Sequence, residues 1–210
     1  MKIQYTIITA LIITAIIATI YVYPLLPELV PSHWNALGEV DAYTKKNVHV
    51  TFMLGICIVL PIFMRILPKL DPKYKNIKSF EGDFAWFTVV FTLFMIALYA
   101  YTTLYALGYQ YPIQAFIIPA MSVLFYTTGL LLAKAKPNYS IGFRLPWTLD
   151  NEDNWNKTHK IASLSFRYGS FALLLTTLLG KYSFSVFMIA LTFMALIPVI
   201  YSYRLHKTSR

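Results

Sequence analysis

The chain has 210 residues, of which 58% are hydrophobic and only 13% are charged, and its formal net charge is +9. A soluble domain of this size could not keep so much apolar surface away from water, so the composition excludes an ordinary soluble protein and indicates a lipid bilayer as solvent. Cys57 is the only cysteine. This excludes an internal disulfide bond and a metal site built from several thiolates, and we expect Cys57 to be a buried, small apolar side chain.

Six apolar stretches are long enough to form membrane-spanning helices. The first, residues 4–23, has 20 residues without a charge, which crosses a hydrocarbon core at about 1.5 Å per helical residue. Its apolar run is too long for the core of a signal peptide, so we expect it to remain as a helix. The other five expected spans are 48–67, 84–107, 112–133, 161–179 and 182–203.

Two connections between these spans are very short, residues 108–112 and residues 180–181. Short connections make consecutive helices antiparallel neighbours. No linker is long enough to separate two domains. The sequence therefore predicts one all-α, polytopic integral membrane domain over residues 1–210, folded as a bundle of six transmembrane helices.

Positive charge lies mainly on one side of this predicted bundle. That face receives the N-terminus, the second and fourth loops and the C-terminus. It holds Lys2, Arg65, Lys69, Lys73, Lys75, Lys78, Lys134, Lys136, Arg144, Lys157, Lys160, Arg204, Lys207 and Arg210, whereas the other face holds only Lys45, Lys46 and Lys181. The positive-inside rule then predicts that both termini are cytoplasmic. Topology and anionic lipid headgroups account for the net charge, so we expect no direct contact with nucleic acid.

The expected outer loop, residues 24–47, is ordered by prolines and aromatic residues. Three prolines end the first helix and keep the next residues extended: Pro24, Pro27 and Pro31. Gly38 permits a tight turn, and the rings of Trp34 and Tyr43 suit a membrane interface. The loop is therefore predicted to present a surface to the outside of the cell.

A metal or proton-relay site in this loop is the alternative. Its ligands would be Glu28, His33, Asp41 and His49, since oxygen and imidazole ligands suit zinc or manganese. Their spacing fits no compact ligand motif such as H-E-x-x-H, and each has an ordinary role available in a cap, a turn or an interfacial hydrogen bond. We therefore predict no metal and no other cofactor.

Two further polar segments lie on the expected inner face. Residues 68–83 are rich in lysine and unpatterned, which predicts a solvated, lipid-facing connection. In the inner segment, residues 134–160, prolines resist helix up to about Pro146. A helix is then predicted to begin near residues 148–151, with good N-cap residues and acidic side chains at its positive end.

This helix carries a polar stripe, because the 3.6-residue period places five polar side chains on one face. They are Glu152, Asn156, His159, Ser163 and Arg167. A polar stripe that enters a membrane helix is costly unless it faces protein, a partner or water. Two interpretations stay open: a structural network from which Arg167 reaches back to the headgroups, or a ligand or partner site. No nucleophile and base occur at a recognisable spacing, so we predict no enzyme.

Two motifs resemble the hallmarks of the SdpI family of toxin immunity integral membrane proteins. The stretch "LPELVPSHWNALGEVDAYTKK" (26–46) lies in an N-terminal signature region, residues 1–67. The stretch "PNYSIGFRLPWTLDNEDNWNKTHKIA" (137–162) lies in a second signature region, residues 134–205. The two hallmarks occur in the order typical of the family, and with the six spans the resemblance covers nearly the whole chain.

The resemblance implies site residues on both faces. The family pattern falls outside on Pro31, His33, Trp34, Asn35, Gly38, Asp41, Tyr43 and Lys45. Inside it falls on Asn138, Gly142, Arg144, Pro146, Trp147, Thr148, Asn151, Trp155, Thr158 and His159. The polar stripe adds Glu152, Asn156 and Arg167 to the inner candidates.

The resemblance also implies a function. The named member of the family protects its cell against a secreted toxic peptide. It also senses that peptide and then sequesters a transcriptional repressor at the membrane. We therefore expect the outer loop around His33 and Trp34 to contact or exclude a peptide, and the inner segment around Arg144, Trp155 and His159 to dock a cytoplasmic partner. The alternatives are a small transporter or membrane enzyme that uses the polar stripe, and a structural membrane protein whose loops only pack together.

Overall fold

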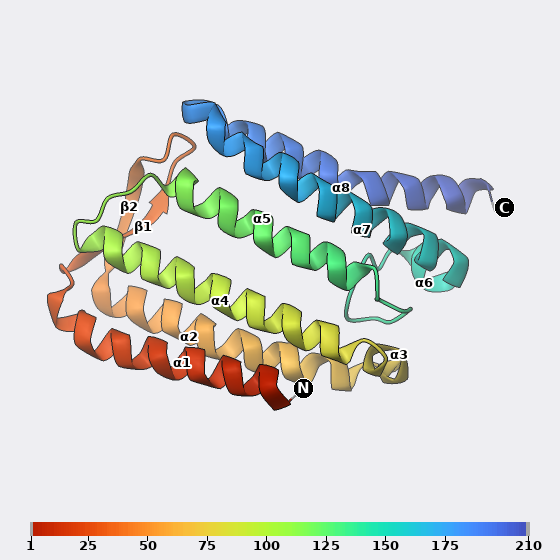
Figure 1. Cartoon of the computed structure of the whole chain (residues 1–210), viewed down its shortest axis with the longest axis horizontal. Coiled ribbons are helices and arrows are strands. Elements are labelled where there is room, and N and C mark those ends of the chain that lie inside the picture. Colours follow the sequence, from red (N-terminus) through yellow and green to blue (C-terminus); the bar gives the residue numbers. More distant parts are fainter. Residues whose placement is uncertain (1, 209–210) are drawn as a thin grey trace.

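The computed structural model describes residues 2–208, most of which are helical (Figure 1). The elements in chain order are α1 (Lys2–Val22), the 3₁₀ helix η1 (Tyr23–Leu25), β1 (Leu29–Trp34), β2 (Val40–Lys45), α2 (Lys46–Ile66), η2 (Leu67–Leu70), α3 (Tyr74–Lys78), α4 (Glu81–Ala106), α5 (Ile113–Leu132), α6 (Pro146–Asp150), α7 (Glu152–Leu175), η3 (Thr176–Tyr182) and α8 (Ser183–Thr208).

Five segments of the described chain are long and apolar enough to cross a membrane. Four of them contain α1, α2, α4 and α5. The fifth, Glu152–Thr208, contains both α7 and α8, which are separated by a turn at Gly180 (φ +55°) and lie side by side in opposite directions (Figure 1). Many large apolar side chains on these helices are exposed, which suits a lipid environment. An all-α, polytopic membrane protein is therefore consistent with the structure.

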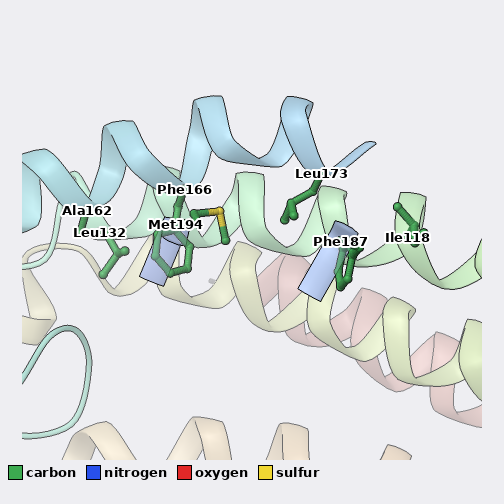
Figure 2. Packing of buried hydrophobic residues seen from close by; sticks show 7 residues of the cluster. All are labelled: Ile118, Leu132, Ala162, Phe166, Leu173, Phe187 and Met194. Carbon is green, nitrogen blue, oxygen red and sulfur yellow. The ribbon is translucent and has the colours of Figure 1, made fainter. Parts of the chain in front are cut away.

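The helices form two groups that meet along α4 and α5. Helices α1, α2 and α4 pack on one another, and helices α5, α7 and α8 form the second group. A buried cluster holds the second group together (Figure 2), and its members are Ile118, Leu132, Ala162, Phe166, Leu173, Phe187 and Met194. The boundary between α4 and α5 is called the seam below.

The two ends of the bundle differ in what they carry. The hairpin β1–β2 and the α4–α5 connection lie at one end, called the hairpin end below (Figure 1). Both ends of the described chain, together with α3 and α6, lie at the other (Figure 1). This second end, called the cationic end, carries the positive charges that the sequence assigns to the inner face, except Arg210, which lies outside the described residues.

The outer loop is extended and turns at Gly38 as expected, but residues 29–34 and 40–45 also pair as a β hairpin across a five-residue turn, which was not predicted. Two features of the sequence prediction are wrong. The connection 68–83 is not merely solvated, since it contains α3 and buries Asp71 and Ile77. Pro146 does not resist helix but starts α6, because the first helical position needs no backbone donor and suits the fixed φ of proline.

Two other expectations about the helices are confirmed in outline. A helix begins next to the expected stretch 148–151, with Asn151 as the N-cap of α7: its side chain accepts a hydrogen bond from the Asn154 backbone. The membrane helix that follows starts earlier than the expected residue 161, because α7 runs without a break from Glu152. Cys57 is fully buried, as expected.

Candidate functional site

The hairpin at the outer loop is built around Asn35. Its side-chain oxygen accepts hydrogen bonds from the backbone amides of Leu37 (2.9 Å) and Glu39 (3.0 Å), which fixes the turn. Gly38 adopts a φ of +85° within this turn, a conformation that favours glycine. The turn is thus set by residues of the first hallmark.

The hairpin is docked on the helices through its inner face. The ring of Trp34 lies 5.9 Å from that of Tyr101 and 5.3 Å from that of Tyr105, both on α4. A Cβ on Gly38 would overlap the side chain of Gln114 on α5. Contacts with both α4 and α5 mean that the hairpin bridges the seam at this end of the bundle.

A cavity of about 490 Å³ lies between the hairpin and the ends of the helices. Its wall includes Trp34 from the hairpin, His49 and Met53 from α2, Thr102 from α4 and Gln114 from α5. No Asp, Glu, Lys or Arg lines it, and its surface is mostly apolar. This size and composition suit a binding site for an uncharged, largely apolar group.

Two polar side chains of this wall are buried, His49 and Thr102. His49 is buried and its Nε2 atom lies 3.2 Å from the hydroxyl of Thr102. The indole Nε1 of Trp34 is buried without a hydrogen-bond partner in the described chain. An unsatisfied buried donor costs free energy, so Trp34 packs here without its usual hydrogen bond.

The four residues of the alternative metal site are dispersed. His33 Nδ1 lies 2.5 Å from Asp41 Oδ1 on the exposed face of the hairpin. Glu28 pairs with Lys46 at 3.0 Å, and His49 is occupied by its contact with the Thr102 hydroxyl. Among residues 2–208, no group of three or more His, Cys, Asp or Glu side chains is placed to hold a metal ion.

At the cationic end, the inner segment is held against the connection between α2 and α4. The carboxylate of Asp71 accepts hydrogen bonds from the Tyr139 amide (2.9 Å) and the Ser140 hydroxyl (2.6 Å). Asn76 donates to the carbonyl of Pro137 at 2.6 Å. These bonds join the two helix groups, so the inner segment bridges them at this end as the hairpin does at the other.

Asn138 shapes the inner segment itself. It is fully buried, and its side-chain oxygen accepts hydrogen bonds from the amides of Ser140 (2.8 Å) and Ile141 (2.6 Å). Gly142 follows with a φ of +116°, and a Cβ there would overlap His159 Nε2. Only glycine therefore allows the backbone to approach the imidazole this closely.

His159 and Trp155 form the buried centre of the inner segment. His159 Nε2 accepts a hydrogen bond from the Phe143 amide (3.1 Å), so Nδ1 carries the proton and donates to the Trp155 carbonyl (2.8 Å). Trp155 is fully buried, stacks on His159 with ring centroids 4.0 Å apart, and donates from Nε1 to the Ala135 carbonyl at 2.9 Å. Both side chains are satisfied within the protein, which indicates a structural role.

The second half of the inner segment is attached to α8. Trp147 donates from Nε1 to the Ser202 hydroxyl (3.0 Å), and Asn154 donates to the Ser202 carbonyl (3.0 Å). Thr158 donates to the Asn154 side chain at 3.0 Å. Thr148 accepts from the Leu145 amide and lies within hydrogen-bond distance of the Phe143 carbonyl. Most residues of the second hallmark thus hold this segment in place.

The expected polar stripe of α7 does not share one environment. Glu152 and Asn156 are exposed, whereas His159 and Ser163 are buried. The Arg167 guanidinium lies 6.0 Å from the centre of the Tyr126 ring, and its buried Nε has no hydrogen-bond partner in the described chain. The stripe therefore divides into an exposed surface near the helix start and a buried part within the bundle.

Several residues that attach the two hallmark segments to the helices could not be identified from the sequence. Asp71, Asn76 and Gln114 make the contacts that attach the two hallmark segments, yet none belongs to a hallmark. Asp71 precedes a proline, which is a turn signal, but nothing in the sequence identifies Tyr139 and Ser140 as its partners. Such pairs become visible only when the chain is folded.

Two known families match two different parts of the chain, one around each hallmark. Residues 134–202, which contain the whole inner segment, all of α7 and most of α8, match the SdpI/YfhL protein family. Over these residues the chain is similar to this family. Residues 10–58, which contain most of α1, the hairpin and the first half of α2, match a domain of unknown function, DUF1648.

A curated relative covers both regions. "Immunity protein SdpI" of Bacillus subtilis (strain 168) is 27% identical over 195 residues, which cover 91% of this chain and 90% of the relative. No solved structure matches the chain significantly. This relationship and the apolar helices identify a multi-pass protein of the plasma membrane that contacts the lipid bilayer.

Proposed function

We propose that this protein is a membrane immunity protein that protects its cell by binding a secreted peptide toxin in the cavity under the hairpin. The observation that carries the proposal is the 490 Å³ cavity, whose roof is made by residues of the first hallmark. The name of the B. subtilis relative, an immunity protein, supports the same function.

The chemistry of the cavity favours an apolar side chain of the toxin as its occupant. A neutral, largely apolar wall stabilises such a group by removing it from water. On the outside of the hairpin, the exposed His33, Asp41 and Tyr43 offer polar and aromatic contacts to the rest of the peptide.

We place the hairpin outside the cell, with six membrane crossings and both termini in the cytoplasm. The crossings are α1, α2, α4, α5, α7 and α8. Two observations support this orientation: both described chain ends lie at the same end of the bundle (Figure 1), and that end carries most of the lysine and arginine residues. In this arrangement a toxin in the outer leaflet or outside the cell meets the hairpin first.

A signalling role follows from the same geometry. The hairpin and the inner segment both bridge the two helix groups, at opposite ends of the bundle. A toxin that binds better to one arrangement of the seam would shift the population toward that arrangement and so change the inner segment. The exposed side chains Arg144, Glu152 and Asn156 then form the surface that sequesters a cytoplasmic transcriptional repressor.

The proposal predicts that filling the cavity abolishes protection. In Met53→Trp the larger side chain occupies the space of the toxin group, so toxin binding should weaken at least about tenfold, equivalent to ~1.4 kcal/mol. Survival of a sensitive host exposed to a panel of secreted membrane-active peptides, including any encoded beside the gene, should fall accordingly. Val59→Trp adds the same ring to the same helix at an exposed position and should protect like the wild type. Membrane abundance of each variant is measured in parallel.

Full protection by an abundant Met53→Trp variant would exclude the cavity as the toxin site.

The inner surface is tested in the same host with a double variant, Glu152→Lys with Asn156→Lys. We expect this variant to protect but to lose toxin-dependent induction of a reporter gene. Loss of protection at normal abundance would contradict the separation of the two roles.

A further inference from the structure

A groove between α1 and α2 at the cationic end is not used by the proposed immunity function. Its open part has a volume of about 730 Å³ and is lined by Lys2, Tyr5 and Thr9 of α1 and by Arg65 of α2. It continues into a cleft of about 260 Å³, which shares Tyr5, Thr9 and Arg65 with the open part. The cleft is otherwise apolar, with Ile8, Ile12, Ile13, Ile58, Pro61 and Ile62 in its wall.

The basic residues of this groove have no acidic partner. The Arg65 guanidinium lies over the Tyr5 ring, 4.2 Å from its centre. The ion pairs formed within residues 2–208 involve neither Arg65 nor Lys2. Glu81 and Lys69 line a smaller cavity that also contains Arg65, but Glu81 forms no ion pair with it in the described chain. The positive charge at the mouth of the groove is therefore free to meet an anion.

The dimensions of the groove match one leaflet of a membrane. The distance along α1 from Lys2 to Ile13 is about 16 Å at 1.5 Å per residue, which is about half of a hydrocarbon core of roughly 30 Å. The basic residues lie at the end of the helices and the isoleucines lie deeper. A phospholipid has the same order of groups, with a phosphate at the surface and an acyl chain below it.

We propose that this groove is a binding site for one anionic phospholipid, such as phosphatidylglycerol. Arg65 and Lys2 bind the phosphate, because guanidinium and ammonium groups form charge-assisted hydrogen bonds with phosphate oxygens. One acyl chain lies along Ile12, Ile58 and Ile62. The apolar cleft favours a lipid over free phosphate, since a free ion would leave the cleft unused. The bound lipid holds α1 against α2.

Native mass spectrometry of the purified full-length protein tests this site. We expect the wild type to retain phosphatidylglycerol at least about tenfold better than phosphatidylcholine. Arg65→Gln should lose most of this preference. Thr9→Phe should also lower retention, because the ring fills the groove without changing any charge. Lys160→Gln removes an exposed cation at the same end of the bundle but outside the groove and should bind lipid like the wild type.

Two results would overturn the proposal. If Thr9→Phe retains phosphatidylglycerol like the wild type, or if Lys160→Gln loses as much as Arg65→Gln, the attraction is a diffuse charge effect and not a groove. Displacement of the lipid by millimolar inorganic phosphate would show that the headgroup alone is recognised. Circular dichroism of each variant confirms that a loss of lipid does not reflect unfolding.

Discussion

Gly142→Ala is expected to remove most of the folded protein from the membrane. The backbone at Gly142 has a φ of +116°, and a Cβ there would overlap the imidazole of His159, which is buried and hydrogen-bonded. Strain and overlap together should cost about 3 kcal/mol or more, a large part of the stability of a typical domain. The measurement is the abundance of a tagged protein in membranes, together with its melting temperature in detergent.

Gly55→Ala provides the matched control for this experiment. Gly55 lies within α2, and no heavy atom outside its own turn lies within 4 Å of a Cβ placed there. Alanine favours helix over glycine, so this variant should be as stable as the wild type or slightly more stable. Equal abundance of the two variants would show that the inner segment does not pack on His159.

Trp155→Ala is expected to have a comparable effect on stability. The side chain is fully buried, stacks on His159 and donates a hydrogen bond to Ala135. Removing a buried aromatic ring costs about 3–5 kcal/mol, whereas Trp155→Phe keeps a ring and should cost only about 1–3 kcal/mol through the unpaired carbonyl. Denaturation of the purified variants in detergent measures both values.

The exposed neighbour Asn156 separates stability from partner binding. Asn156→Ala should leave the free energy of unfolding within about 0.5 kcal/mol of the wild type, because the side chain is exposed. If Trp155→Ala proved as stable as Asn156→Ala but lost toxin-dependent signalling, Trp155 would contact the partner directly and not support the fold. Its complete burial predicts the opposite result.

Trp155 and His159 of the inner hallmark are expected to support the fold, whereas the sequence alone suggests that they bind a partner. The family resemblance implies that the segment around Trp155 and His159 docks a partner. The structure places both in the interior, where each of their polar atoms has a partner within the protein. The candidate residues left exposed for a partner are Arg144, Pro146, Asn151, Glu152 and Asn156.

The helices could be predicted from the sequence because their signal is local. Long apolar runs mark the membrane helices, and the acidic residues after Asn151 mark the start of α7. The charge asymmetry could likewise be read without any structure. These predictions depend on residues within a few turns of one another, which is the range over which sequence patterns carry information.

The sites could not be predicted in the same way because their contacts join distant residues. Asp71 binds Ser140, which is 69 residues away, and the cavity wall combines a hairpin with the ends of several helices. The β hairpin was missed for a related reason. Pro31 lies inside the first strand, where a proline normally argues against a strand, and packing of Trp34 on α4 supports the hairpin from a distant part of the chain.

Calorimetric titration with the toxin tests directly whether the toxin binds in the cavity under the hairpin. The purified protein in nanodiscs is titrated calorimetrically with the secreted peptide against which it protects cells, using the wild type, Met53→Trp and Val59→Trp. We predict one peptide bound per wild-type or Val59→Trp chain and at least about tenfold weaker binding to Met53→Trp. Equal binding by all three would contradict the cavity as the site, and no binding by a wild type that protects cells would contradict immunity by toxin binding.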